Sequence, residues 1–337
     1  MLIRLRTILA VLAGVMALAN TAGQAFAETA ETSPLQLEAK IPLGSVQGRI
    51  DHMAVDLKRQ RLFVAELGND TVGIIDLANR KLIRTIAGLK EPQGVGYEPS
   101  TDTLYVANAG DGSVRLFEGS DYNSTGLIEL GSDADNIRVE AAAKRVFIGY
   151  GSGALAVIDP STRSKAGDIP LTAHPESFQI DPDTNQIFVN VPDARAIAVV
   201  DRASQKQIGK WPLTDRGANF PMALDHVRRQ VLVIFRAPAE LGVFSMTDGK
   251  LVTTPETCGD ADDLFIDAKR NRIYVSCGAG FLDVLEAKEA TYRRIARIPT
   301  VSGARTSLFV PEMDRLLVAV RASSGEPAAI WIFRPMP

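Results

Sequence analysis

The sequence contains little cysteine and no block of basic residues. Cys258 and Cys277 are the only cysteines, so at most one intramolecular disulfide can form. The chain has 37 Lys and Arg against 40 Asp and Glu. Proteins that bind nucleic acid neutralise phosphates with clustered Lys and Arg, so this composition argues against a nucleic-acid partner.

Several short motifs of known chemistry are also missing. The sequence has no C-x-x-C-H haem attachment site, no H-E-x-x-H zinc helix, no P-loop and no G-x-S-x-G nucleophile elbow. Whether the protein is an enzyme therefore stays open at this point.

The one pronounced apolar run lies at the N-terminus. Arg4 and Arg6 precede apolar residues 8–19, and small residues then lead to Ala25-Phe26-Ala27. This pattern predicts a signal peptide over residues 1–27, cleaved before Glu28. A membrane anchor is the alternative, but the run is short for a membrane span, and no nearby cysteine could accept a lipid. We expect a periplasmic or secreted protein with no membrane span after cleavage. Its 35 basic and 40 acidic side chains give it a formal charge of −5.

The rest of the chain repeats one pattern with a period of about 42 residues. Each copy has an apolar run that ends in a β-rich tetrapeptide. The seven tetrapeptides are Phe63-Val64-Ala65-Glu66, Tyr105-Val106-Ala107-Asn108, Phe147-Ile148-Gly149-Tyr150, Phe188-Val189-Asn190-Val191, Leu232-Val233-Ile234-Phe235, Tyr274-Val275-Ser276-Cys277 and Leu317-Val318-Ala319-Val320. Runs of β-branched and aromatic residues bounded by turn residues predict strands.

The spacing predicts an all-β fold over residues 28–337. Four short antiparallel strands fit into each repeat, and repeats of this kind bury their faces against one another as the blades of a propeller. The last repeat has only three strands, and residues 36–43 form an unpaired strand near the predicted mature N-terminus. We therefore predict a single seven-bladed β-propeller whose last blade is closed by the N-terminal strand.

The tetrapeptides also carry a family resemblance. Tyr105-Val106-Ala107-Asn108 and its counterparts resemble the YVTN repeat, and the whole mature chain resembles the bacterial periplasmic propellers of the YncE-like family. WD40-like propellers share this architecture. The resemblance implies a fold more than a chemistry, because related propellers include DNA-binding, lactone-hydrolysing and purely interacting proteins.

The residues that begin the inner strand of each blade are the candidate site, because in a propeller they gather at one mouth of the central channel. A constant offset from the tetrapeptides selects polar side chains in most blades. The predicted ligand-binding residues are Arg49, Asp51, His52, Gln93, Asp135, Asn136, His174, Glu176, Ser177, Asn219, Asp262, Asp263 and Arg305. An alternative role is structural, because polar side chains at these positions also hydrogen-bond neighbouring blades.

Oxygen-rich rings suit hard cations, so Ca²⁺ or Mg²⁺ is a candidate cofactor, with Asp135, Glu176 and Asp262 as its ligands. The spacing does not choose between a metal and a polar small molecule. We expect a monomeric module that binds a small polar ligand or a protein partner. The alternative is a metal-dependent hydrolase of lactone type, in which His52 or His174 moves a proton.

Other polar residues are given structural roles. Asp56, Asp181, Asp225 and Asp267 fall in hairpin turns, where a short carboxylate accepts nearby backbone N–H groups. His226 lies in such a turn, on the face away from the predicted mouth. Cys258 and Cys277 lie at strand ends that meet in an antiparallel blade, and an oxidising compartment favours a disulfide between them. A free thiol or a nucleophile is the alternative.

Overall fold

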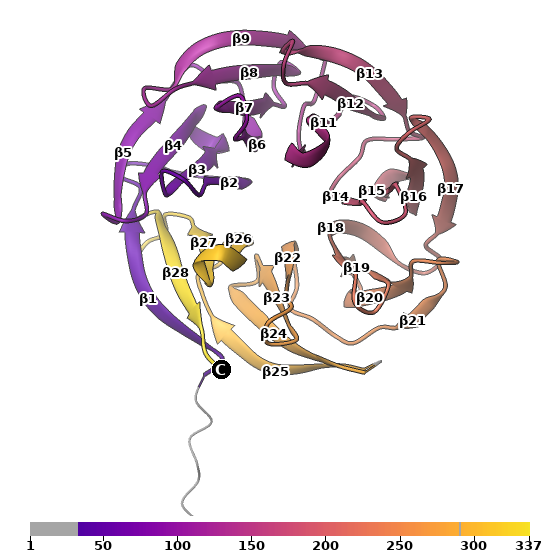
Figure 1. Ribbon diagram of the computed structural model, residues 1–337. Coiled ribbons are helices and arrows are strands. Elements are labelled where there is room, and N and C mark those ends of the chain that lie inside the picture. The colour runs from indigo at the N-terminus through magenta and orange to yellow at the C-terminus, as the bar shows by residue number, and fades with distance from the viewer. Residues whose placement is uncertain (1–32, 290) are drawn as a thin grey trace, which may run out of the picture. The chain divides into compact units, whose positions relative to one another are not determined.

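The computed structural model describes residues 33–289 and 291–337, which form a ring of seven four-stranded antiparallel sheets (Figure 1). This confirms the predicted seven-bladed propeller. The predicted signal peptide, residues 1–27, lies outside the described residues. Among the described residues, no helix is long and apolar enough to cross a membrane.

Strands follow one another outward from the channel in each of the first six blades. Blades 1 to 3 contain β2 (Met53–Asp56), β3 (Arg61–Glu66), β4 (Thr71–Asp76) and β5 (Lys81–Ile86); β6 (Pro92–Glu98), β7 (Thr103–Asn108), β8 (Ser113–Glu118) and β9 (Asn123–Glu129); and β10 (Ile137–Glu140), β11 (Arg145–Tyr150), β12 (Ala154–Asp159) and β13 (Ser164–Pro170). Blades 4 to 6 contain β14 (Phe178–Asp181), β15 (Gln186–Val191), β16 (Ala196–Asp201) and β17 (Lys206–Pro212); β18 (Gly217–Asp225), β19 (Gln230–Ala237), β20 (Ala239–Ser245) and β21 (Leu251–Thr253); and β22 (Ala261–Asp267), β23 (Arg272–Cys277), β24 (Phe281–Lys288) and β25 (Thr291–Pro299).

Blade 7 joins the two ends of the described chain. Its order is β26 (Thr306–Val310), β27 (Arg315–Val320), β28 (Ala329–Pro335) and β1 (Leu35–Pro42). The outer pair is antiparallel, with Leu35 opposite Pro335 and Pro42 opposite Ala329. The predicted closure by the N-terminal strand is therefore confirmed, and the ring has no open seam.

Burial explains why the tetrapeptides recur. They occupy the second strand of each blade, which neighbouring blades cover on both faces, and β7 is buried along its whole length. The outer strands instead alternate between exposed and half-buried residues, as in β17. Apolar side chains pack across the seams, so that Tyr105 of blade 2 joins Ile137 and Ile148 of blade 3 in one cluster. The core is thus a set of seams around the channel.

Short turns connect the first and second strands of each blade, and we call the side of the ring that carries them the hairpin face. Asp56, Asp225 and Asp267 each accept a backbone N–H from their own turn, at 3.1, 2.9 and 3.2 Å. The predicted role of these carboxylates is confirmed. In the described part of the chain, four single-turn 3₁₀ helices also lie in the loops, namely η1 (Leu67–Asn69), η2 (Ala141–Ala143), η3 (Pro192–Ala194) and η4 (Pro311–Met313).

The two cysteines form a disulfide, as predicted. Cys258 lies in the loop before β22 and Cys277 ends β23, with their Cα atoms 5.8 Å apart. Both side chains are buried at the seam between blades 5 and 6. The bridge therefore ties the loop that enters blade 6 to the second strand of the same blade.

Candidate functional site

The candidate site lies where the chain enters the inner strands, on the side of the ring opposite the hairpin face. Backbone pairing sets the position of these residues. The N–H groups of Asp51, Asp135 and Glu176 donate to Ala65, Gly149 and Asn190 of the adjacent second strands, at 2.7, 2.9 and 2.9 Å. The same hydrogen bond thus recurs in three blades. It holds each entry residue at the same height beside the channel.

Most of the predicted residues line one cavity of about 210 Å³, which we call the mouth. They are Arg49, Asp51, His52, Gln93, Asp135, Asn136, His174, Glu176, Ser177, Asp262 and Arg305, and Asp133, Phe220 and Arg236 join them. Asn219 is fully buried instead, and it donates to Asn190 Oδ1 and the Ala196 carbonyl at 3.0 and 3.1 Å. Asp263 lies deeper, in the wall of the channel.

Part of the mouth has carboxylates that are matched by arginines. Arg49 lies 2.6 Å from Asp51. Asp262 is held from two sides, by Arg236 at 2.5 Å and by Arg305 at 2.9 Å. The guanidinium of Arg236 also lies over the ring of Phe220, with its central carbon 3.9 Å from the ring centroid. These ion pairs and the stack fix this part of the mouth.

Another part of the mouth has carboxylates without an arginine. Asp135 is only 5% exposed, and its Oδ1 atom has no hydrogen-bond partner among the described residues. His52 lies next to it, with Nε2 3.8 Å from that oxygen. Glu176 likewise has no ion-pair partner within 4.0 Å in the described part of the chain. Two acidic side chains therefore face the mouth with unused acceptor atoms.

The surroundings of these two carboxyl groups oppose their ionisation. Burial raises the pKa of Asp135 to about 7, and the charges of Asp51 and Glu176 add to the effect. Burial also raises the pKa of Glu176 to about 7, with further contributions from Asp262 and Asp51. Burial raises the pKa of Asp262 as well, although Arg305 and Arg236 counteract it. Near neutral pH, the Asp135 and Glu176 pair can bind either protons or an external cation.

The two mouth histidines differ in their contacts. His174 lies with Nδ1 2.6 Å from the Gly151 carbonyl and 3.4 Å from Asp133. A ring nitrogen next to a carbonyl oxygen must carry the proton, so Nδ1 of His174 is a donor. His52 lies with Nε2 3.8 Å from both Asp51 and Asp135. This is beyond hydrogen-bond distance, so the imidazole of His52 remains available to a ligand.

The predicted metal ligands are not gathered around one point. Asp262 is occupied by its two arginines, whereas Asp135 and Glu176 are not paired with arginine. In the described part of the chain, three ligand atoms come within 4.8 Å of one another at one place, formed by Asp181, Asp183 and His226. That group lies on the hairpin face, and Asp181 already accepts from Thr184 and Arg229 there. Asp135 and Glu176 are the predicted ligands that no arginine occupies.

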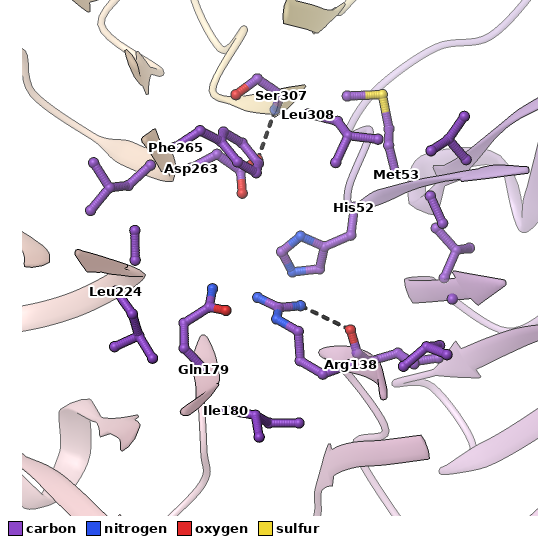
Figure 2. A pocket seen from close by; sticks show the side chains of 18 of the residues that line it. His52, Met53, Arg138, Gln179, Ile180, Leu224, Asp263, Phe265, Ser307 and Leu308 are labelled. Atoms are coloured by element: carbon purple, nitrogen blue, oxygen red, sulfur yellow. Dashed lines mark hydrogen bonds between the residues drawn. The ribbon is translucent and has the colours of Figure 1, made fainter. Parts of the chain in front are cut away.

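The channel continues below the mouth as a second cavity of about 470 Å³, bounded by His52 at one end and His226 at the other. Figure 2 shows His52, Arg138, Gln179 and Asp263 turned toward its central space. Apolar side chains form most of the remaining wall, including Met53, Ile180, Leu224, Phe265 and Leu308. Sequence reasoning did not identify Arg138 or Gln179.

No protein-family model matches this chain, and neither does any curated protein sequence. Solved structures with a similar fold include the following two. A chain of the hydrazine synthase of Kuenenia stuttgartiensis aligns with a TM-score of 0.73 and 16% identity, over 84% of this chain and 94% of that one. A chain of a mitotic checkpoint complex aligns with a TM-score of 0.73 and 13% identity, over 97% and 98% of the two chains. Identities this low show a shared β-propeller fold and leave the function open.

Proposed function

We propose that this protein is an exported propeller of the YVTN-repeat, YncE-like kind, and that it binds a small cationic ligand at the mouth. The observation that carries the proposal is the unpartnered, buried carboxyl group of Asp135 beside Glu176. A buried carboxylate is unfavourable without a compensating charge or hydrogen bond. A bound cation would supply the compensating charge.

Three further features support this proposal. The disulfide suits the oxidising compartment to which the predicted signal peptide would direct the chain. The tetrapeptide pattern supports the family, and the propeller fold is widely used for binding. The arginines of the mouth are already engaged by Asp51, Asp260 and Asp262, so the remaining charge of the site is negative.

The cation could be a divalent metal ion or an organic amine, since both complement paired carboxylates. Calorimetric titration of the protein with Ca²⁺, Mg²⁺ and a short alkyl diamine distinguishes these two kinds of cation. We expect binding to strengthen from pH 5.5 to pH 8, because the cation must displace protons from groups whose pKa is about 7.

A double variant, Asp135→Asn with Glu176→Gln, should abolish this binding. Asp133→Asn is the matched control, because Asp133 lines the same mouth but its side chain is 49% exposed. If no cation binds, or if binding survives the double variant, the proposal is wrong.

A second candidate is hydrolysis of a lactone or ester at the same mouth. It is favoured by one observation, namely that Asp135 and Glu176 have pKa values of about 7, close to His52. Groups that titrate near the working pH are efficient general acids and bases. A screen of lactones and aryl esters, with and without added Ca²⁺, tests this reading. Turnover that persists in Asp135→Asn would exclude the role given to this residue.

A further inference from the structure

Arg138 is a partly buried cation of the channel that has no acid partner among the described residues. It lies on β10, and among residues 33–289 and 291–337 no carboxylate comes within 4.0 Å of it. Its Nε donates to the Phe178 carbonyl at 3.0 Å, and its two terminal nitrogens donate to the Ile137 carbonyl at 2.9 Å and to Ser177 Oγ at 3.2 Å. A guanidinium has five N–H donors, so two remain for the channel.

Partial burial without a carboxylate partner distinguishes Arg138 from Arg236 and Arg305. Burial lowers the pKa of Arg138, and the more distant charges of Asp263 and Asp135 only oppose this effect. By contrast, Arg236 and Arg305, which are also largely buried, each lie against aspartates of the mouth. A partly buried charge without an ion-pair partner is unfavourable, so Arg138 is the place in the channel where an anion would be most stabilised.

Asp263 faces the same space from β22, on the far side of the channel (Figure 2). Its Oδ2 atom accepts the Ser307 N–H at 2.7 Å, and no cationic side chain of the described residues lies within 4.0 Å. Burial raises the pKa of Asp263 well above its ordinary value, so its carboxyl group can keep its proton and donate it. Gln179 gives one amide N–H to the Met222 carbonyl at 2.9 Å, which leaves a second.

We propose that the channel holds a second ligand site, for a small monocarboxylate with an apolar body, with its carboxylate on Arg138 and its body against Met53, Ile180, Leu224, Phe265 and Leu308. The planar fork of arginine matches a carboxylate. A single guanidinium balances one negative charge, so a monoanion fits better than a dianion. The cavity, about 470 Å³, lies within the usual range of small-molecule pockets.

The anion does not need to pass the acidic mouth. His226 lines the lower end of the channel cavity and its side chain is 47% exposed, so the cavity reaches the hairpin face. The channel site thus goes beyond the proposed function and stands without it, because its polar groups are Arg138, Gln179 and Asp263 rather than Asp135 and Glu176.

Calorimetric titration with benzoate, benzamide and acetate tests this proposal. Benzoate has both the charge and the apolar body, whereas benzamide lacks the charge and acetate lacks the body. We expect benzoate to bind at a single site, and each of the other two to bind at least about tenfold more weakly. Equal affinity for benzamide would overturn the proposal, as would no binding of benzoate.

Variants of the same protein locate the site. Arg138→Gln should weaken benzoate binding about tenfold or more, and Arg145→Gln is the control, because that arginine is on the surface of the same blade. Ala54→Phe narrows the channel without replacing Arg138, and it should also weaken binding. The Asp135→Asn, Glu176→Gln double variant should bind benzoate as wild type does. Unchanged binding in both Arg138→Gln and Ala54→Phe would contradict the proposal, and loss of binding in the mouth variant would place benzoate at the mouth instead.

Discussion

The inner strands carry carboxylates at both ends, and the two ends use them differently. On the hairpin face, Asp267 accepts the Arg270 backbone N–H, the Arg270 side chain and the Tyr274 hydroxyl, at 3.2, 2.9 and 2.7 Å. At the mouth, Asp135 has an acceptor atom with no partner. Both side chains are nearly inaccessible to solvent. Similar burial with such different hydrogen bonding separates a carboxylate that stabilises the fold from one that we propose binds a ligand.

The difference also appears in the pKa values. On the hairpin face, burial disfavours the charge of Asp181, but hydrogen bonds from Thr184 and the Asp183 N–H, together with the charge of Arg229, hold its pKa below the ordinary value. At the mouth, burial raises the pKa of Asp135 to about 7. The hairpin-face carboxylate thus stabilises the fold when it is ionised, and the mouth carboxylate stabilises it when it is protonated.

The largest effect should follow from Asp267→Ala. Its loss removes the acceptor of the Tyr274 hydroxyl and of two Arg270 donors, the backbone N–H and the side chain, in a buried place, so we expect a loss of about 3–5 kcal/mol in the free energy of unfolding. Urea denaturation followed by circular dichroism measures it. Asp121→Ala, at an exposed turn, should change this free energy by less than about 0.5 kcal/mol. Equal effects of the two variants would mean that Asp267 stabilises the fold no more than an exposed carboxylate does.

Removal of the disulfide should have the next largest effect on the free energy of unfolding. Replacing both cysteines with alanine frees a loop of 19 residues in the unfolded state, which should lower the free energy of unfolding by about 3 kcal/mol. Urea denaturation of the double variant, with and without reducing agent, checks this value. The reductant should destabilise wild type and leave the variant unchanged. Equal stability of the variant and oxidised wild type would show that the mouth side of blade 6 does not need the bridge.

Asp135→Asn and Asp181→Asn should change the free energy of unfolding by smaller amounts, and in opposite directions. The folded-state pKa of Asp135 lies above its unfolded value, so wild type loses stability as pH rises from about 4 to 7. Asp135→Asn avoids this loss and should be more stable than wild type by about 2 kcal/mol at pH 8. The pKa of Asp181 is lowered instead, so Asp181→Asn should be less stable by about 1–2 kcal/mol above pH 4. Denaturation curves at pH 4.5 and pH 8 give both differences, and a common sign would refute the comparison.

The smallest effect is predicted for Val227→Ser. Val227 lies in the turn between β18 and β19 and is 83% exposed. The neighbouring Asp225 keeps its bonds to Arg228 in this variant. The free energy of unfolding should therefore change by less than about 0.5 kcal/mol in a thermal or urea titration. A larger loss would mean that the turn itself, and not its carboxylate, stabilises the hairpin face.

The fold could be predicted from the sequence because every blade repeats the same pattern of apolar strand residues and turn residues. The tetrapeptides mark the fully buried second strands, and their spacing sets the number of blades. The pairing of the N-terminal strand followed from counting strands, since the last repeat lacks one. The mouth could be located in the same way, because a constant offset from Phe63, Tyr105 and their counterparts selects residues at one height of the channel.

The other side chains that line the mouth and the channel could not be predicted in this way. Arg236 reaches the mouth from β19, a second strand that continues past its tetrapeptide, and no repeat position marks it. Arg138 and Gln179 lie two residues beyond the second predicted position of their blades, and side chains two apart on a strand share one face. That position reads Ala54, Gly96, Arg138, Gln179, Ala223, Phe265 and Leu308, and all seven line the channel. The alternation of side chains along the inner strands is therefore the sequence signal that could have identified Arg138 and Gln179.

The closure of blade 7 has a consequence for how the protein folds. Gln36 and Arg334 are hydrogen-bonded across positions 298 residues apart, so the last sheet cannot form until nearly the whole described chain is present. Bringing such distant segments together is entropically unfavourable and slow compared with forming the hairpins inside one blade. Six blades can assemble by adding neighbours, but only the seventh covers the two apolar sheet faces at the ends of the unfinished ring. The interval before closure is thus the stage at which the chain is most exposed to aggregation through these faces.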